Sequence, residues 1–169
     1  MQPEILVAYA SRHGSTREVA EAVADVLREH HLQVQVRPAG EVRDLEGFDA
    51  VVLGGALYTG RLHADARRFL GRFRRELGGG TPIALFAMGP KTPEPSDVEG
   101  SREQLARALA RRPEIHPVST AIFGGVIDPA RLRFPFSHLP AGDARDWAHI
   151  RAWAVDLARI LTTRSAVAP

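Results

Sequence analysis

Hydroxyl-bearing residues cluster directly after the first apolar segment of the chain, where they could bind a phosphate. The cluster consists of Ser11, Arg12, His13, Gly14, Ser15 and Thr16. If a helix begins here, its free N–H groups and the positive end of its peptide dipoles favour an anion. The hydroxyls supply further donors, the glycine permits close backbone approach, and the arginine adds a cationic fork. These residue types in this order predict a phosphate cradle.

The same stretch also fits an ordinary helix start. Ser15 or Thr16 would then cap the helix, and Glu18 would complete a capping box. The local sequence does not separate these two interpretations. Other phosphate motifs fit badly, because no lysine follows the glycine as in a P-loop nucleotide triphosphatase and no Gly-x-Gly pattern marks a dinucleotide site. A response-regulator receiver would need acidic residues at the ends of the first and third strands, which this sequence lacks.

Apolar runs alternate with helical patterns along the chain, and this alternation sets the expected fold. Strands are predicted at residues 5–10, 32–36, 48–53, 82–88 and 118–123. Helices are predicted at residues 15–30, 64–77, 101–112 and 146–161. The helix at 64–77 has Phe69, Leu70, Phe73 and Leu77 on one apolar face, and Trp147 and Trp153 are expected in or near the core on the last helix. The second strand alternates as an edge strand does, whereas the third is a continuous apolar run that ends at Gly54 and Gly55. The pattern predicts an α/β fold, a doubly wound parallel sheet with helices on both faces.

The composition narrows the possible chemistry. A chain of 169 residues fits one domain, predicted at residues 1–163, with a flexible C-terminal tail at residues 164–169. Without cysteine there is no disulfide, thiolate metal site or dithiol centre, so redox chemistry needs a cofactor. The seven histidines show no paired spacing on one helix face, and we expect no metal site. Basic residues are not interleaved with exposed aromatics, which argues against nucleic acid as a partner.

Nothing in the sequence requires a membrane. The N-terminus lacks the pattern of a signal peptide, and no segment is apolar for long enough to span a bilayer, which predicts a cytoplasmic protein. The arginine-rich residues 67–75 invite interpretation as a docking or membrane face. At helical spacing, however, the arginines fall mainly opposite Phe69 and Phe73, which predicts a solvated face.

Three stretches of the chain together resemble one known family. Residues 8–16, with the form Ser-Arg-x-Gly-x-Thr, resemble the FMN phosphate loop of flavodoxins, most closely that of the menaquinone-dependent protoporphyrinogen oxidase branch. Residues 52–63, with an aromatic-x-Gly pattern and a histidine before the helix, resemble the second flavin loop of that branch. Residues 121–126, followed by residues 142–147, resemble its fifth strand and last helix. The similarity covers nearly the whole chain.

The resemblance implies a flavodoxin-like five-stranded sheet with strand order 2-1-3-4-5, and FMN as the cofactor. Besides the cradle, it implies that two further loops contact the flavin. The second loop consists of Ala56, Leu57, Tyr58, Thr59 and Gly60, with the tyrosine ring stacked on the isoalloxazine. The third loop consists of Met88, Gly89 and Pro90, within residues 88–93, and is expected to wall the other side of the ring through backbone N–H groups.

Several residues qualify this resemblance. Arg61 and His63 are candidates for placing positive charge near the reduced flavin or an acidic substrate, although His63 equally fits a simple helix start. His13 stands where many flavodoxins have a hydroxyl residue, so one phosphate hydrogen bond is replaced by an imidazole contact or lost. Only residues 131–136 correspond to a longer basic and aromatic stretch of the oxidase branch. Peripheral membrane contact and the porphyrinogen substrate therefore stay open.

Two connections are longer than a simple βα unit needs, namely residues 89–100 and 124–142. Both leave the carboxyl ends of predicted strands, where open α/β sheets bind ligands. Phe134 and Phe136 flank a proline in the second connection. Three roles are open for them: closing over the substrate side of the flavin, packing on the sheet, or forming a homodimer contact.

The sequence supports three functions. The first is an FMN-dependent oxidoreductase that takes electrons from a small-molecule substrate and passes them to a quinone or similar acceptor. The second is a flavodoxin-type electron carrier, which positive charge at Arg12 and Arg61 disfavours, because such carriers are typically acidic around the flavin. The third is a non-redox phosphate-binding module of the same fold.

Overall fold

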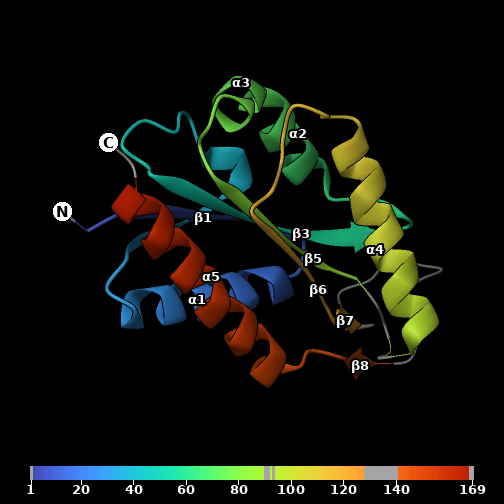
Figure 1. Cartoon of the computed structure of the whole chain (residues 1–169). Coiled ribbons are helices and arrows are strands. Elements are labelled where there is room, and N and C mark those ends of the chain that lie inside the picture. Colours follow the sequence, from blue (N-terminus) through green and yellow to red (C-terminus); the bar gives the residue numbers. More distant parts are fainter. Residues whose placement is uncertain (1, 90–91, 93, 128–140, 168–169) are drawn as a thin grey trace.

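The chain folds into three layers, with one central sheet between two layers of helices (Figure 1). The computed structural model describes residues 2–89, 92, 94–127 and 141–167. The main parallel strands lie in the order β2-β1-β3-β5-β6. Counting only these five strands along the chain, this is the predicted order 2-1-3-4-5, with β2 at an edge.

The strands and helices have the following bounds. The parallel strands are β1 Glu4–Ala10, β2 Gln33–Pro38, β3 Ala50–Tyr58, β5 Ile83–Met88 and β6 Ser119–Phe123. The short strands are β4 Arg61–Leu62, antiparallel to β3, and the β7 Val126–Ile127 and β8 Gly142–Asp143 pair. The α-helices are α1 Ser15–Glu29, α2 Ala64–Arg72, α3 Arg74–Gly78, α4 Pro95–Ala110 and α5 Trp147–Val167, and a 3-10 turn covers Ala39–Glu41.

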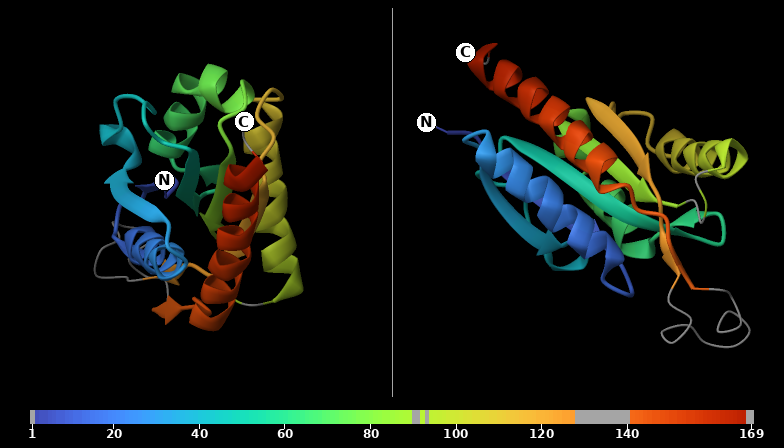
Figure 2. Two further views of the ribbon diagram at one scale, coloured as in Figure 1. Left: turned by 60° about the vertical axis from the view of Figure 1, so that its left-hand side comes forward. Right: turned by 90° about the horizontal axis from the view of Figure 1, so that it is seen from below.

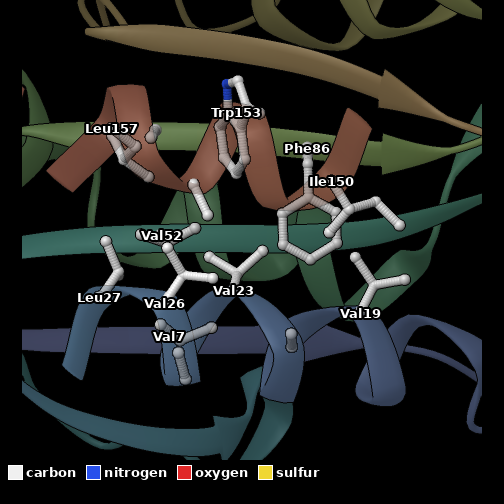
Figure 3. Close-up of a cluster of buried hydrophobic side chains, with 14 of the residues drawn as sticks. Val7, Val19, Val23, Val26, Leu27, Val52, Phe86, Ile150, Trp153 and Leu157 are labelled. Carbon is white, nitrogen blue, oxygen red and sulfur yellow. The ribbon is translucent and has the colours of Figure 1, made fainter. Parts of the chain in front are cut away.

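The two faces of the sheet carry two separate apolar cores. One core joins β1, β3 and β5 to α1 and α5, and the other joins the same strands to α2, α3 and α4. The view from below shows α1 and α5 side by side across one face (Figure 2). In the first core, Phe86 lies between the sheet and α5, close to Ile150 and Trp153 (Figure 3). Because both faces of the central strands are covered, those strands are apolar throughout, as the sequence pattern indicated.

The third strand is longer than predicted, because β3 continues through both glycines to Tyr58. A Cβ at Gly54 would lie 2.1 Å from Cζ of Phe86, and one at Gly55 would lie 2.7 Å from Cδ1 of Leu62. These glycines therefore make room for side chains packed on opposite faces. The prediction that the strand ends at these glycines is therefore wrong.

Three helices also differ from the prediction. The expected helix 64–77 is interrupted at Phe73, where ψ is 20°, although all four of its predicted apolar residues are buried. The fourth helix begins at Pro95, six residues before the expected start, so much of the expected 89–100 loop is helix. Proline favours the first position of a helix, which accounts for the earlier start at Pro95. The last helix continues to Val167, into the expected tail.

The last helix also exposes a residue that was expected in the core. Trp147 was placed on the apolar stripe, yet it is 45% exposed, whereas Trp153 is buried as expected. The indole Nε1 of Trp153 donates to Ser119 Oγ over 2.9 Å, which satisfies its polar end in the core. Within the described part of the chain, no helix is both long and apolar enough to cross a lipid bilayer.

Candidate cofactor-binding site

The predicted cradle lies at the carboxyl end of β1, where the chain turns into α1. Gly14 is the residue that caps the helix, and its φ of 86° is the left-handed conformation that glycine adopts without strain. Ser11 Oγ accepts a hydrogen bond from the Gly14 N–H over 3.1 Å, which closes the turn. The first intrahelical bond runs from Glu18 N–H to Gly14 O, so the N–H groups of residues 15–17 have no acceptor inside the helix. The turn thus presents several donors at one place.

Thr16 is the most unusual member of the cradle. Its side chain is fully buried, and its Oγ1 has no hydrogen-bond partner. A buried hydroxyl without a partner costs about 1–3 kcal/mol, so such groups normally have a role outside packing. Together with the free helix N–H groups, this unsatisfied hydroxyl fits a site built to receive an anion.

The capping box that competed with the cradle is not formed. No side chain caps α1, and Glu18 instead accepts a hydrogen bond from Arg145 Nη1 over 2.6 Å. Arg145 also pairs with Asp143 over 2.8 Å, which holds the pKa of that carboxyl below its usual range. Its guanidinium lies 4.8 Å from the Trp147 ring centre, which accounts for the exposed tryptophan. This arginine ties the β7–β8 pair to the start of α1, and no local sequence signal indicated it.

The second predicted loop lies against the cradle. The Arg12 guanidinium is 5.6 Å from the centre of the Tyr58 ring, and the His13 ring is 6.4 Å from it, edge-on. The His63 ring lies 6.0 Å from the tyrosine ring. Three of the predicted residues, from two loops far apart in sequence, therefore lie around the aromatic ring of a fourth.

The rest of the second loop forms a tight hairpin. Tyr58 pairs with Arg61 across the turn, with Thr59 and Gly60 at φ values of 46° and 80°. Ala56 is buried in the core, so only its backbone is available to a ligand, and Leu57 is half-buried. The hairpin keeps the tyrosine at the carboxyl end of the central strand β3, next to the cradle.

The third predicted loop is described only in part, at residues 88, 89 and 92. Met88 is buried in the core as the last residue of β5, and the Gly89 N–H already donates to Phe123 O over 3.0 Å. A Cβ at Gly89 would lie 2.6 Å from Ser101 Oγ and 2.8 Å from Leu57 Cδ1, so the glycine permits close packing. Pro90 lies outside the described residues. Residues 131–136, which include Phe134 and Phe136, lie outside them as well.

His63 has a defined structural role at the start of α2. Its Nδ1 accepts a hydrogen bond from the Asp65 N–H over 3.1 Å, so the neutral ring carries its proton on Nε2. Burial lowers the pKa of His63, and the positive charges of Arg12, Arg67 and Arg68 act in the same direction, against the opposing effect of Asp65. The lowered pKa favours the neutral imidazole, and the hydrogen bond from Asp65 makes His63 the cap of α2, the helix-start role that the sequence left open.

The lowered pKa of His63 predicts a pH-dependent stability. Below the ordinary histidine pKa of about 6.5 the unfolded chain binds a proton that the folded site resists, so stability falls as the pH drops from there through the folded pKa. In His63→Asn the amide oxygen still caps the helix without titrating. We expect the urea midpoint of the wild type to fall further between pH 7.5 and pH 5.5 than that of the variant. Equal falls would contradict the assignment.

The comparisons with known proteins agree on the fold. A family model described as "Flavodoxin domain" matches residues 6–135. Protoporphyrinogen IX dehydrogenase [quinone] of Escherichia coli (strain K12) is 24% identical over 131 residues, which cover 76% of this chain and 72% of that protein.

Solved structures with similar coordinates indicate the same fold. A flavodoxin from the domain Archaea superimposes with a TM-score of 0.63 at 16% identity and covers 94% of this chain and 99% of its own. Rubredoxin oxygen:oxidoreductase from Desulfovibrio gigas reaches a TM-score of 0.67 at 16% identity, over 98% of this chain but only 38% of its own. At these identities the structural likeness shows the fold alone.

Proposed function

This chain belongs to the flavodoxin domain family, whose cofactor is FMN, and from that premise we propose that it holds FMN on residues 11–16 and acts as an oxidoreductase. The observation that carries the proposal is the buried, unpartnered Oγ1 of Thr16 beside the free N–H groups of α1. A phosphate at this place would accept from the hydroxyl and from those N–H groups.

Each of the surrounding residues has a defined task in this proposal. Ser11 Oγ already accepts from Gly14, and its own hydrogen stays available to a phosphate oxygen. Arg12 offsets phosphate charge and lies over the Tyr58 ring. Tyr58, at the carboxyl end of β3, supplies an aromatic face on which the isoalloxazine would stack. When bound, FMN supplies the two-electron redox chemistry that no side chain of this cysteine-free chain provides.

The charge around the proposed flavin site favours an enzyme over a simple carrier. Arg12 lies 5.6 Å from the centre of the Tyr58 ring on the cradle side, and Arg61 pairs with Tyr58 across the hairpin. Positive charge there stabilises a reduced, anionic flavin and attracts an acidic substrate. By similarity to the Escherichia coli enzyme, we propose a porphyrinogen-like donor and a quinone acceptor.

One observation favours a second candidate function. The chain aligns with 99% of the length of a flavodoxin from the domain Archaea, so it contains a counterpart of nearly every part of that protein. A carrier would need no substrate-binding element beyond the three loops.

Turnover and potentiometry distinguish the two functions. We expect FMN-loaded protein to oxidise protoporphyrinogen when a quinone is supplied, at a rate well above that of free FMN at the same concentration. Heat-unfolded protein with the same FMN is the control. No turnover with any quinone, combined with two widely separated one-electron potentials, would contradict the enzyme and support the carrier.

A further inference from the structure

A cavity of about 290 Å³ lies beside the second loop, on the face of the sheet that α2 and α4 cover. Both helices are seen on this face in Figure 1. The cavity is lined by residues 104, 107, 108 and 111 of α4 and its C-cap, and their spacing places all four on one face of the helix. It is also lined by residues 60–62, 67 and 70, which belong to the hairpin and to α2. It is separate from the cradle, since it contains none of residues 11–16.

The lining of this cavity is strongly cationic. It contains five arginines and no acidic residue, and the arginines are Arg61, Arg67, Arg107, Arg111 and Arg112. Only Arg107 forms an ion pair with a carboxylate of the described chain, to Glu103 over 3.5 Å, and both side chains of that pair are well exposed. Five guanidinium groups around one cavity repel each other, and an anion inside it would relieve that repulsion.

Two of the five guanidinium groups are held in place. Arg67 Nε donates to Leu62 O over 3.0 Å, and Arg112 Nη1 donates to Arg111 O over 3.1 Å. A Cβ at Gly71 would lie 2.8 Å from Arg112 Nη2, so this glycine lets the guanidinium lie against α2. The Nε of Arg112 is buried and has no partner. The cavity is thus partly organised before any ligand arrives, which reduces the entropy lost on binding.

We propose that this cavity binds a small organic anion with at least two carboxylate or phosphate groups. The volume is at the lower end for ligand pockets, about 300–1,000 Å³, which fits a compact polyanion better than a dinucleotide. Arginine forks match carboxylate and phosphate oxygens in pairs. Leu62, Leu70 and Ala108 line the same space and suit a carbon skeleton between the charged groups.

The site is coupled to the second loop through the hairpin. Arg61 lines the cavity and pairs in the strand with Tyr58. An anion bound here would neutralise positive charge next to that tyrosine. The cavity is lined by residues outside the cradle, so the proposal does not rest on FMN binding there.

Calorimetry on the whole chain, saturated with FMN, tests this inference. The probes are citrate and inorganic pyrophosphate, with acetate and sodium chloride at matched ionic strength as reference ligands. We expect saturable one-to-one binding of at least one probe and none of acetate. The stronger of the two probes identifies carboxylate or phosphate as the preferred group.

Variants on one helix locate the site. Arg107→Gln and Arg111→Gln should each weaken binding at least tenfold, whereas Arg102→Gln, on α4 but outside the cavity, should leave it unchanged. Thermal melting shows that each variant is folded. Absence of saturable binding, or equal weakening by all three variants, would overturn the inference. Binding that appears only in cofactor-free protein would overturn it too, because it would place the anion in the cradle.

Discussion

Replacing Thr16 with valine is expected to weaken FMN binding and, at the same time, to stabilise the protein without cofactor. Valine keeps the shape of the buried side chain but removes a hydroxyl that has no partner. Removing this desolvated group should raise the free energy of unfolding by about 1 kcal/mol. Losing a hydrogen bond to a charged phosphate, about 1.5–3 kcal/mol, should raise the Kd for FMN roughly 10- to 100-fold. Urea unfolding and fluorescence titration measure the two effects.

The opposite signs of the two effects make this test specific. A residue that only packs would lose stability and affinity together or change neither. Thr162→Val is the matched control, because its Oγ1 already donates to Ala158 O over 2.8 Å on α5, a helix that supplies no residue of the cradle. It should leave the Kd unchanged. Unaltered FMN affinity in Thr16→Val would remove this hydroxyl from the proposed site.

The second large effect concerns the core beneath the site. Gly54→Ala should destabilise the protein by about 1–3 kcal/mol, because the new methyl group would overlap the Phe86 ring. Phe86→Ala should cost about 3–5 kcal/mol, since this ring packs against Phe123 and Trp153 with centre separations of 5.7 and 6.0 Å. In the double variant the methyl group enters the vacated space. The double variant should therefore lose clearly less unfolding free energy than the two single variants added together.

Denaturant midpoints of the single and double variants measure this coupling. Gly100→Ala is the control, because a Cβ there meets nothing within 4 Å inside α4. It should be neutral or stabilising by roughly 0.5–1 kcal/mol, as expected for glycine in a helix. If Gly54→Ala is as harmless as the control, the close packing of this glycine against Phe86 is wrong. If a single variant does not fold, Phe86→Leu provides a milder background for the same cycle.

The positions of the strands along the chain were accessible from the sequence, because local patterns mark them. Continuous apolar runs mark β1, β3 and β5 as strands buried on both faces, and the alternation in β2 marks an edge. The cradle was equally accessible, because hydroxyls, a glycine and a helix start are adjacent in the chain. The family resemblance supplied the order in which the strands are placed.

Features that depend on contacts between distant residues were missed. The glycines of β3 look like a strand end until Phe86 is seen to occupy the space above Gly54. Arg145 binds Glu18 across 127 positions, so the local sequence left a capping box at Glu18 open. The arginine-lined cavity requires α2, α4 and β4 to meet, which no single segment indicates. For His63 the sequence left a positive charge and a simple helix start open, and in the structure its side chain caps α2.

Titration of the cofactor-free protein with FMN tests the central claim most directly. Following flavin fluorescence at micromolar protein, we expect saturable quenching at one FMN per chain, with riboflavin binding much more weakly because it lacks the phosphate. Folded protein that leaves the fluorescence of FMN unchanged, or that binds riboflavin as tightly as FMN, would contradict a phosphate cradle at residues 11–16.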